Sequence, residues 1–156
     1  MIEITIPGFK NLQIDHVVCD YNGTLAVDGE LLPGVRDLLV TLSASVGIHV
    51  ITADTFGLAK AQLSGLPVAL KIISLENQAE EKLEFISKLG SDTVFAIGNG
   101  MNDRKMLASA AVGIALIHKE GASSATVTSA DIVSSSIIDA LDLLLNPKRL
   151  IATLRS

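Results

Sequence analysis

The chain has 156 residues, of which 49% are apolar and 19% are charged, and it carries a net charge of −5. This composition predicts one folded domain over residues 1–156 and excludes an intrinsically disordered chain. Because the sequence has no basic stripe and only 3% of its residues are aromatic, nucleic-acid binding is not expected.

The apolar runs and the cysteine count limit the possible settings of the protein. No apolar run approaches the roughly 18 residues that cross a bilayer, so we expect a cytoplasmic protein with no membrane partner. Cys19 is the only cysteine, which excludes an internal disulfide and a multi-cysteine zinc site. Its position inside an apolar run favours a small buried side chain.

Apolar spacing and turn residues predict the elements of the first half of the chain. A short strand over residues 1–8 is expected to pair, across a turn, with residues 13–20. The helix that starts at Pro33 has a clear signal, because apolar residues recur at helical spacing. The predicted elements are a core strand over 14–19, a hairpin over 25–32 with an Asp28-Gly29 turn, the helix from Pro33, a strand over 47–52, a helix over 55–65 and a strand over 68–74.

Strands and helices continue to alternate in the second half of the chain. The predicted elements are a helix over 75–90, a strand over 93–98, a helix over 102–111, short strands over 112–117 and 130–133, a helix over 136–145, and a last helix that Asn146 caps with Pro147 in its first turn. This alternation predicts a doubly wound parallel sheet in three α/β/α layers, preceded by a short N-terminal antiparallel hairpin. The segment between Asp20 and Thr52 is filled by a predicted helix and strand, so no cap domain fits there.

Several polar residues follow the predicted strands at the edge where doubly wound folds bind ligands. Asp20 ends the first core strand and is a possible nucleophile or metal ligand, although an Asp at a strand end is often only a turn former. Thr52 ends the next strand and suits a phosphate oxygen as a hydrogen-bond donor. Lys82, on a predicted helix, could neutralise a phosphate, although most helical lysines are simply solvated. Asp103 lies in the first turn of a helix, where a carboxylate is favoured in any case.

The motifs taken together resemble those of the haloacid dehalogenase-like (HAD) superfamily. Residues 20–24, "DYNGT", match its first motif, and residues 50–54, "VITAD", match its second. Residues 80–103, "EEKLEFISKLGSDTVFAIGNGMND", resemble its third and fourth motifs at the spacing of the phosphorylation domain of P-type ATPases. The resemblance spans about residues 14–133 and is closest to the small soluble members that resemble P-type ATPases and lack a cap.

The resemblance implies a Mg²⁺-dependent phosphohydrolase or phosphotransferase that forms an aspartyl-phosphate on Asp20 and acts on a small phosphorylated substrate. It implies the following roles: catalysis by Asp20, Asn22, Thr52 and Lys82; phosphate binding by Asp20, Thr52, Ala53 and Lys82; Mg²⁺ binding by Asp20, the Asn22 carbonyl, Asn99 and Asp103; and support from Gly23, Thr24, Gly98, Gly100 and Asn102.

Two positions depart from the family pattern. Phosphatases of the superfamily usually carry Asp two residues after the nucleophile, whereas this chain has Asn22, which cannot shuttle a proton. We therefore expect slow turnover of alkyl phosphates, since general acid–base catalysis contributes about 10²- to 10⁴-fold. The P-type pattern carries a Mg²⁺-binding Asp where this chain has Asn99, which should weaken the attraction for the metal.

The residues leave other functions open. Asn22 and Asn99 also fit a catalytically weak phosphate-binding or regulatory module that kept the fold. A receiver-like signalling domain is disfavoured because residues 68–74 end without an acid, and a dehalogenase is disfavoured by the "GNGMND" turn. Without a cap the site should be open, which suits a large substrate or closure by another subunit, and capless relatives often oligomerise. We therefore expect a homo-oligomer.

Overall fold

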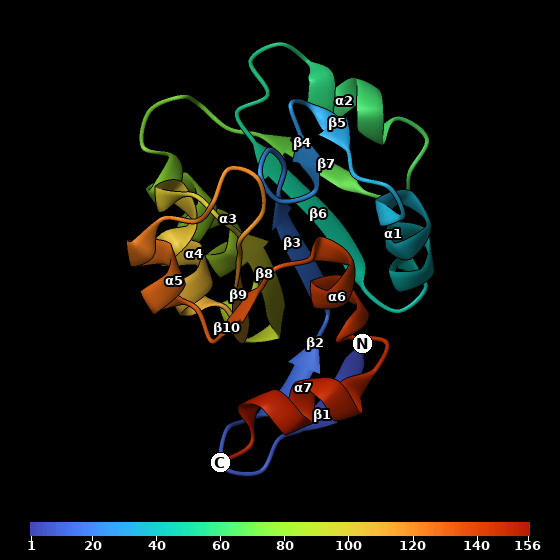
Figure 1. Ribbon diagram of the computed structural model, residues 1–156, viewed down its shortest axis with the longest axis vertical. Helices are drawn as coiled ribbons and strands as arrows, with labels where there is room; N and C mark the ends of the chain where they lie inside the picture. The colour runs from blue at the N-terminus through green and yellow to red at the C-terminus, as the bar shows by residue number, and fades with distance from the viewer.

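A six-stranded parallel sheet forms the centre of the computed structural model, which describes residues 1–156, and helices cover both of its faces (Figure 1). Across the sheet the strands are β10 (Ile132–Ser134), β9 (Val112–Leu116), β8 (Val94–Gly98), β3 (His16–Asp20), β6 (Gly47–Thr52) and β7 (Ala69–Ile72). The predicted α/β/α fold with a doubly wound sheet is confirmed.

The helices form one layer on each face of the sheet. On one face α1 (Val35–Ser43) packs against α6 (Ile137–Asp142), and on the other α4 (Arg104–Ser109) lies between α3 (Gln78–Leu89) and α5 (Ser124–Ser129). Because side chains alternate along a strand, β3 supplies both layers: Val17 and Cys19 pack in the α1–α6 core, and Val18 packs in the α3–α4 core. The central strand is therefore apolar on both faces until it reaches Asp20.

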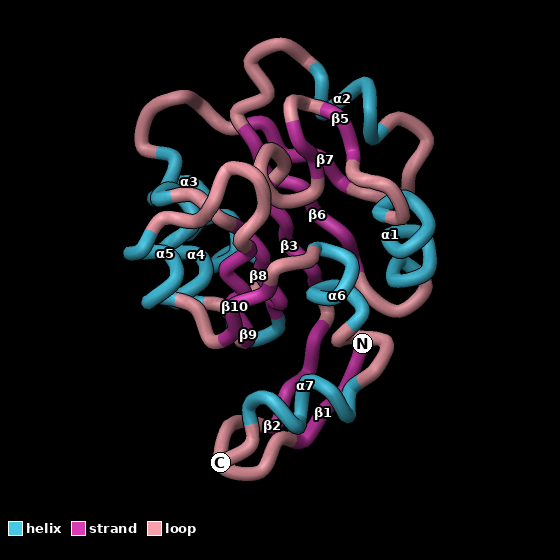
Figure 2. The backbone as a smooth tube through the Cα atoms, in the orientation of Figure 1, coloured by secondary structure: helices cyan, strands magenta, loops and turns pink.

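Two small hairpins lie outside the main sheet. The N-terminal hairpin is formed by β1 (Ile2–Thr5) and β2 (Asn11–Ile14), and helix α7 (Pro147–Leu154) packs on it beside both chain ends (Figure 2). The predicted pairing partner, residues 13–20, is wrong beyond Ile14, because β3 pairs with β6 and β8 in the main sheet. The second hairpin, β4 (Ala26–Val27) and β5 (Glu30–Leu31), turns at Asp28 and Gly29, whose φ angles are 52° and 83°. Those angles are typical of the tight turn that the Asp-Gly pair predicts.

Some helix boundaries differ from the predictions. Helix α2 (Leu58–Leu63) begins three residues late because Gly57 has a φ of 71°, and α3 begins only after Asn77, whose φ is 56°. Helix α6 ends at Asp142 and continues only as a turn. Asn146 precedes α7 but does not cap it, because its side-chain amide donates instead to the Asp142 carbonyl.

Helix α5 and two short 3₁₀ helices, η1 (Ser91–Thr93) and η2 (Met101–Asp103), are absent from the predictions. The α5 sequence, "SATVTS", is rich in β-branched and hydroxyl residues and lacks an apolar period, so its local preference for a helix is weak. Contacts with α4 stabilise it, together with a hydrogen bond of 2.6 Å from the Thr126 hydroxyl to the Gly100 carbonyl. None of the helices combines the length and the apolar character that crossing a bilayer would require.

The loop after β3 is tied to the β4–β5 hairpin by a buried tyrosine. Tyr21 is fully buried and its hydroxyl donates a hydrogen bond of 2.7 Å to the carbonyl of Gly29. The side chain therefore belongs to the core and not to the mouth of the site, and it fixes the hairpin beside Asp20.

We expect Tyr21→Phe to lower the free energy of unfolding by about 1 kcal/mol, because the Gly29 carbonyl loses its buried donor. Urea unfolding followed by circular dichroism measures the change. Thr41→Val removes an exposed hydroxyl and is the control, with an expected change below about 0.5 kcal/mol. Equal effects of the two substitutions would contradict the role given to Tyr21.

Candidate active site

The polar residues at the carboxyl ends of β3, β6 and β8 surround one pocket. In the sheet β3 lies between β6, which follows it in the chain, and β8, so the order of connection reverses beside Asp20. Open parallel sheets bind ligands at such switch points. The pocket has a volume of about 390 Å³, and its lining includes Asp20, Thr52, Lys82 and Asn99. The structure thus brings together residues from four distant segments of the sequence.

A buried lysine links two carboxylates at the base of the pocket. The ammonium group of Lys82 lies 3.0 Å from Oδ1 of Asp20 and 2.7 Å from Oδ1 of Asp103. The Lys82 side chain is only 1% exposed. The usual expectation that a lysine on a helix is solvated is therefore wrong for Lys82. The side-chain oxygen of Asn102 also accepts a hydrogen bond of 3.5 Å from this ammonium group. The Asn102 side-chain amide in turn donates a hydrogen bond of 2.6 Å to the side-chain oxygen of Gln78, which holds α3 against the turn after β8.

The charges in this cluster do not balance. Burial first, and then repulsion from Asp103, raise the pKa of Asp20 to about 7, while Lys82 opposes the rise. Burial tends to lower the pKa of Lys82, but attraction to Asp20 and Asp103 outweighs it and brings the value to about 12. Lys82 therefore stays protonated and can neutralise only one of the two carboxylates.

Asp103 is the better satisfied of the two carboxylates. Its Oδ2 accepts from the backbone N–H groups of Asn99 and Gly100, each at 3.0 Å, while its Oδ1 accepts from Lys82. The residue is fully buried, and a Cβ atom at Gly98 would overlap its carboxyl group. Because both oxygens are engaged below the pocket, this arrangement disfavours Asp103 as a direct metal ligand. The role of Asp103 in orienting Lys82 and the turn is the one that the contacts support.

The loop after Asp20 turns sharply and faces Asn99. Gly23 has a φ of 80°, and its N–H donates a hydrogen bond of 2.8 Å to the carbonyl of Ala26. The buried Thr24 hydroxyl approaches the side-chain oxygen of Asn99 at 3.5 Å. The Asn22 side chain accepts a hydrogen bond of 3.2 Å from the Gly29 N–H, so its oxygen is directed to the hairpin. Asn22 therefore braces the loop and has no proton to exchange.

The end of β6 presents a hydroxyl to the pocket. Thr52 accepts a hydrogen bond of 3.4 Å from the Asp54 N–H, which leaves its own proton available for donation. Ala53 lines the same pocket. Asp54 lines it too, but its two carboxylate oxygens accept from Ala59 and Lys60 at the start of α2, at 2.8 and 3.2 Å. Asp54 is thus a helix cap and not a free acid.

Four polar residues of the pocket are absent from the predicted site: Asp54, Thr55, Gln78 and Glu120. Gln78 has no recognisable signal, because it is one polar residue in the first turn of a helix. Glu120 has a recognisable signal, because it follows the predicted strand over 112–117 at the same edge of the sheet as the other strand ends. The rule that strand ends carry the site applies to that strand as well.

The donor set beside Asp20 fits a hard divalent cation with few protein ligands. No group of three or more His, Cys, Asp or Glu side chains is placed to share a metal ion. Oxygen ligands are offered by residues that line the pocket, among them the Asp20 carboxylate, the Asn22 carbonyl and the Asn99 amide. Mg²⁺ prefers oxygen and often keeps several waters, so this set suits it better than Zn²⁺.

Comparison with known proteins gives a sequence relative and several structural ones. No protein-family model matches the chain. It is 49% identical over 78 residues to the uncharacterized protein MJ0073 of Methanocaldococcus jannaschii, a match covering 47% of this chain and 84% of that protein.

Solved structures of HAD superfamily hydrolases have the same fold. The cobalt-bound deoxy-D-mannose-octulosonate 8-phosphate phosphatase of Haemophilus influenzae has a TM-score of 0.72 and 13% identity, and the match covers 92% of this chain and 94% of that one. The Moraxella catarrhalis 3-deoxy-D-manno-octulosonate 8-phosphate phosphatase, in complex with magnesium, phosphate and KDO, has a TM-score of 0.66 and 18% identity, with coverage of 91% and 94%. A Legionella pneumophila protein provisionally assigned as a HAD subfamily III A hydrolase has a TM-score of 0.69 and 17% identity, with coverage of 90% and 87%. The HAD-like fold expected from the motifs is thus confirmed.

We expect Asp20→Asn to raise the free energy of unfolding of the metal-free protein by about 1–2 kcal/mol at pH 8. The folded-state pKa of Asp20, about 7, lies above its ordinary value of 3.8. Between these values the folded protein binds more protons than the unfolded chain, so wild-type stability falls as pH rises. The advantage of the variant should therefore grow from pH 4 to pH 8, as measured by urea unfolding with EDTA.

Asp103→Asn is the matched control and should change stability in the opposite direction. It removes the carboxylate that accepts three hydrogen bonds, so we expect a loss of about 3 kcal/mol at pH 8. If both substitutions destabilised the protein equally, the assignment of the surplus charge to Asp20 would be wrong.

Proposed function

We propose that this chain, which belongs to the same family as the uncharacterized protein MJ0073, is a phosphohydrolase or phosphotransferase acting through Asp20. The fold that it shares with HAD superfamily hydrolases supports this proposal. The observation that carries the proposal is the Asp20–Lys82 ion pair at the switch point of the sheet, with the Thr52 hydroxyl on the next strand. The fold shared with two phosphatases of sugar phosphates supports a small phosphorylated substrate.

The chain's own groups suit a phosphoryl group above Asp20. The Thr52 hydroxyl and the Ala53 N–H would donate to its oxygens, and Lys82 would offset its charge, since all three residues line the pocket. A phosphoryl transfer site works mainly by positioning and by electrostatic stabilisation. Asp103 and Asn102 would act indirectly by fixing the ammonium group of Lys82.

The reaction proceeds in two displacements. A carboxylate oxygen of Asp20 forms a bond to phosphorus while the bond to the leaving oxygen breaks, and the leaving group takes that electron pair. Water then forms a bond to phosphorus while the bond from phosphorus to the Asp20 oxygen breaks. Asp20 keeps that electron pair as a carboxylate, and the protons of the water leave with the phosphate or pass to solvent. Asn22 cannot protonate the leaving group or activate the water, so substrates whose leaving groups need no proton should react best.

Mg²⁺ is the cofactor that we propose, held by Asp20, the Asn22 carbonyl and the Asn99 side chain, with Asp103 acting below them. When bound, it would neutralise charge on the phosphoryl oxygens. Because its backbone carbonyl is the proposed ligand, Asn22 can serve the metal even though its side chain faces the hairpin.

The mouth of the pocket carries exposed apolar side chains. Phe56, which is 88% exposed, and Leu58 line the pocket itself. This rim supports a site that is open in the isolated chain, in a single domain without a cap. Closure by another subunit, and hence a cytoplasmic homo-oligomer, remains our proposal.

The two amides favour a second candidate function. With Asn22 and Asn99 in place of acids, the chain could bind phosphate or hold it on Asp20 without fast turnover, as a regulatory module would. The two candidates differ in whether phosphate release requires Asp20.

We expect Mg²⁺-dependent release of phosphate from acetyl phosphate and p-nitrophenyl phosphate, and we expect Asp20→Asn to lower it by about 10³-fold or more. Asp92→Asn, an exposed Asp outside the pocket, is the control and should keep full activity. If Asp20→Asn and the wild type are equally inert, the regulatory candidate replaces the enzyme.

Asn22→Asp should restore a proton shuttle. We expect it to raise turnover of an alkyl phosphate such as glycerol phosphate by about 10- to 100-fold, with little change for acetyl phosphate. Initial rates on both substrates, measured for the variant and the wild type, test this. An equal change on both would mean that Asn22 does not limit leaving-group protonation.

A further inference from the structure

The loop after β9, residues 117–123, brings a carboxylate to the pocket that the function proposed above does not use. Glu120 lines the same pocket as Asp20, Asn22 and Asn99. In Figure 1 this orange loop rises beside the blue loop that follows β3. A Cβ atom at Gly23 would overlap both the Glu120 carboxylate and the Asn99 side-chain amide. The three residues therefore meet at one point beside the Asp20 loop.

The proposed metal ligands carry little negative charge, because Asp20 is the only carboxylate among them. One oxygen of Asp20 already pairs with Lys82, and both oxygens of Asp103 are engaged. The Asn22 carbonyl and the Asn99 amide are neutral. A divalent cation at this position would thus meet one carboxylate, whose charge Lys82 partly cancels. Metal affinity rises with the number of charged oxygen ligands, so a second carboxylate would matter here.

We propose that Glu120 supplies the carboxylate that is missing at position 99, and binds the divalent cation directly or through one of its waters. The inference rests on the proposed function, since it concerns the metal of that site. Glu120 is exposed and none of its side-chain oxygens accepts a hydrogen bond or ion pair from the rest of the chain, so it is available to a ligand.

Asn99 holds the Glu120 loop in this position. Its side-chain Nδ2 donates a hydrogen bond of 3.2 Å to the Gly121 carbonyl. Its backbone carbonyl accepts a hydrogen bond of 2.9 Å from the Ser123 N–H. An aspartate at position 99 could not make the first of these bonds, because an ionised carboxylate only accepts. Asn99 is therefore neutral where an aspartate would carry charge, and its amide positions the loop that carries the Glu120 carboxylate.

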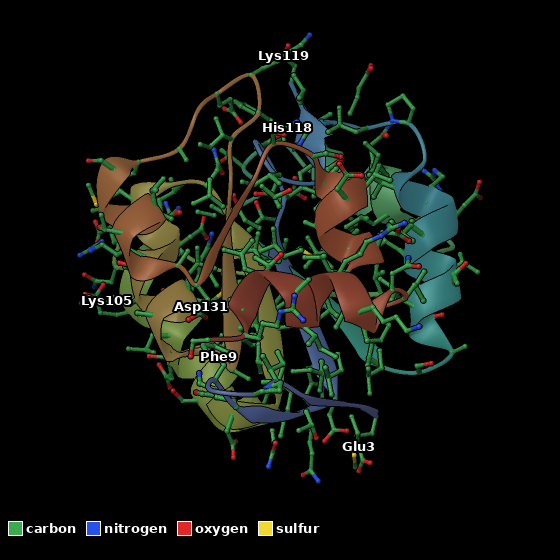
Figure 3. All side chains as sticks on the ribbon, turned by 60° about the horizontal axis from the view of Figure 1, so that its bottom comes forward. Glu3, Phe9, Lys105, His118, Lys119 and Asp131 are labelled. Atoms are coloured by element: carbon green, nitrogen blue, oxygen red, sulfur yellow. The ribbon has the colours of Figure 1, made fainter.

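The proposal is tested by measuring Mn²⁺ binding to the intact chain in the absence of substrate, with Mn²⁺ electron paramagnetic resonance or calorimetry. We expect Glu120→Gln to weaken Mn²⁺ binding by about 10- to 100-fold. Glu3→Gln is the control, because it makes the same charge change on β1. Figure 3 labels Glu3 at the opposite end of the molecule from His118 and Lys119 of the Glu120 loop. Thermal melts without metal should coincide for all three proteins.

A second variant separates charge from local structure. Asn99→Asp added to Glu120→Gln returns a carboxylate to the pocket, so we expect Mn²⁺ affinity to recover to within about threefold of the wild type. Failure to recover, with an unchanged melt, would overturn the replacement of position 99 by Glu120.

The inference and the proposed function fail in different ways. If Glu120→Gln binds Mn²⁺ like the wild type while Asp20→Asn does not, Glu120 is not a ligand and the proposed function stands. If Asp20→Asn also binds like the wild type, the metal site beside Asp20 is wrong, and the inference about Glu120 falls with it.

Discussion

One buried ammonium group between two carboxylates is the constraint on which the site depends. Lys82 reaches both Asp20 and Asp103, and Asp103 also accepts hydrogen bonds from the backbone N–H groups of Asn99 and Gly100. The uncompensated charge therefore rests on Asp20, at the floor of the pocket. Burying a charge without a full partner costs stability. This cost is concentrated on the residue that would form a bond to phosphorus, where a bound cation would relieve it.

The sheet holds this cluster in place. Two apolar layers fix β3, so that Asp20 ends a strand that cannot shift without disrupting both cores. Lys82 comes from α3 and Asp103 from η2, and Asn102 and Gln78 join these two elements. Groups that stand on packed strands and helices keep their geometry better than groups on free loops. The polar cluster is therefore positioned by apolar packing around β3 together with the hydrogen bond that joins η2 to α3.

Two amides distinguish this site from an ordinary acid–base site. Asn22 braces the β4–β5 hairpin through the Gly29 N–H, and Asn99 braces the loop after β9 through the Gly121 carbonyl. In both positions the HAD motifs that the sequence resembles have an acid. Here each side chain has a structural contact instead. In the function that we propose, the chemistry of the pocket would come from Asp20, Lys82 and Thr52, and Glu120, which lies outside the matched motifs, would supply further charge.

The sequence by itself determined the alternation of strands and helices, and with it the fold, because apolar periodicity and turn residues are local properties. The sequence also predicted that Asp20, Thr52 and Lys82 belong to one site, since strand ends and motif spacing can be read from the order of the residues, and all three line the pocket. It could not identify α5, whose residues favour no helix until α4 and Gly100 stabilise it. Only the tertiary structure decided that Lys82 is buried, that Asp103 is saturated and that Glu120 faces Gly23. These facts depend on which distant segments meet, and the folding of the chain, not its local pattern, sets those contacts.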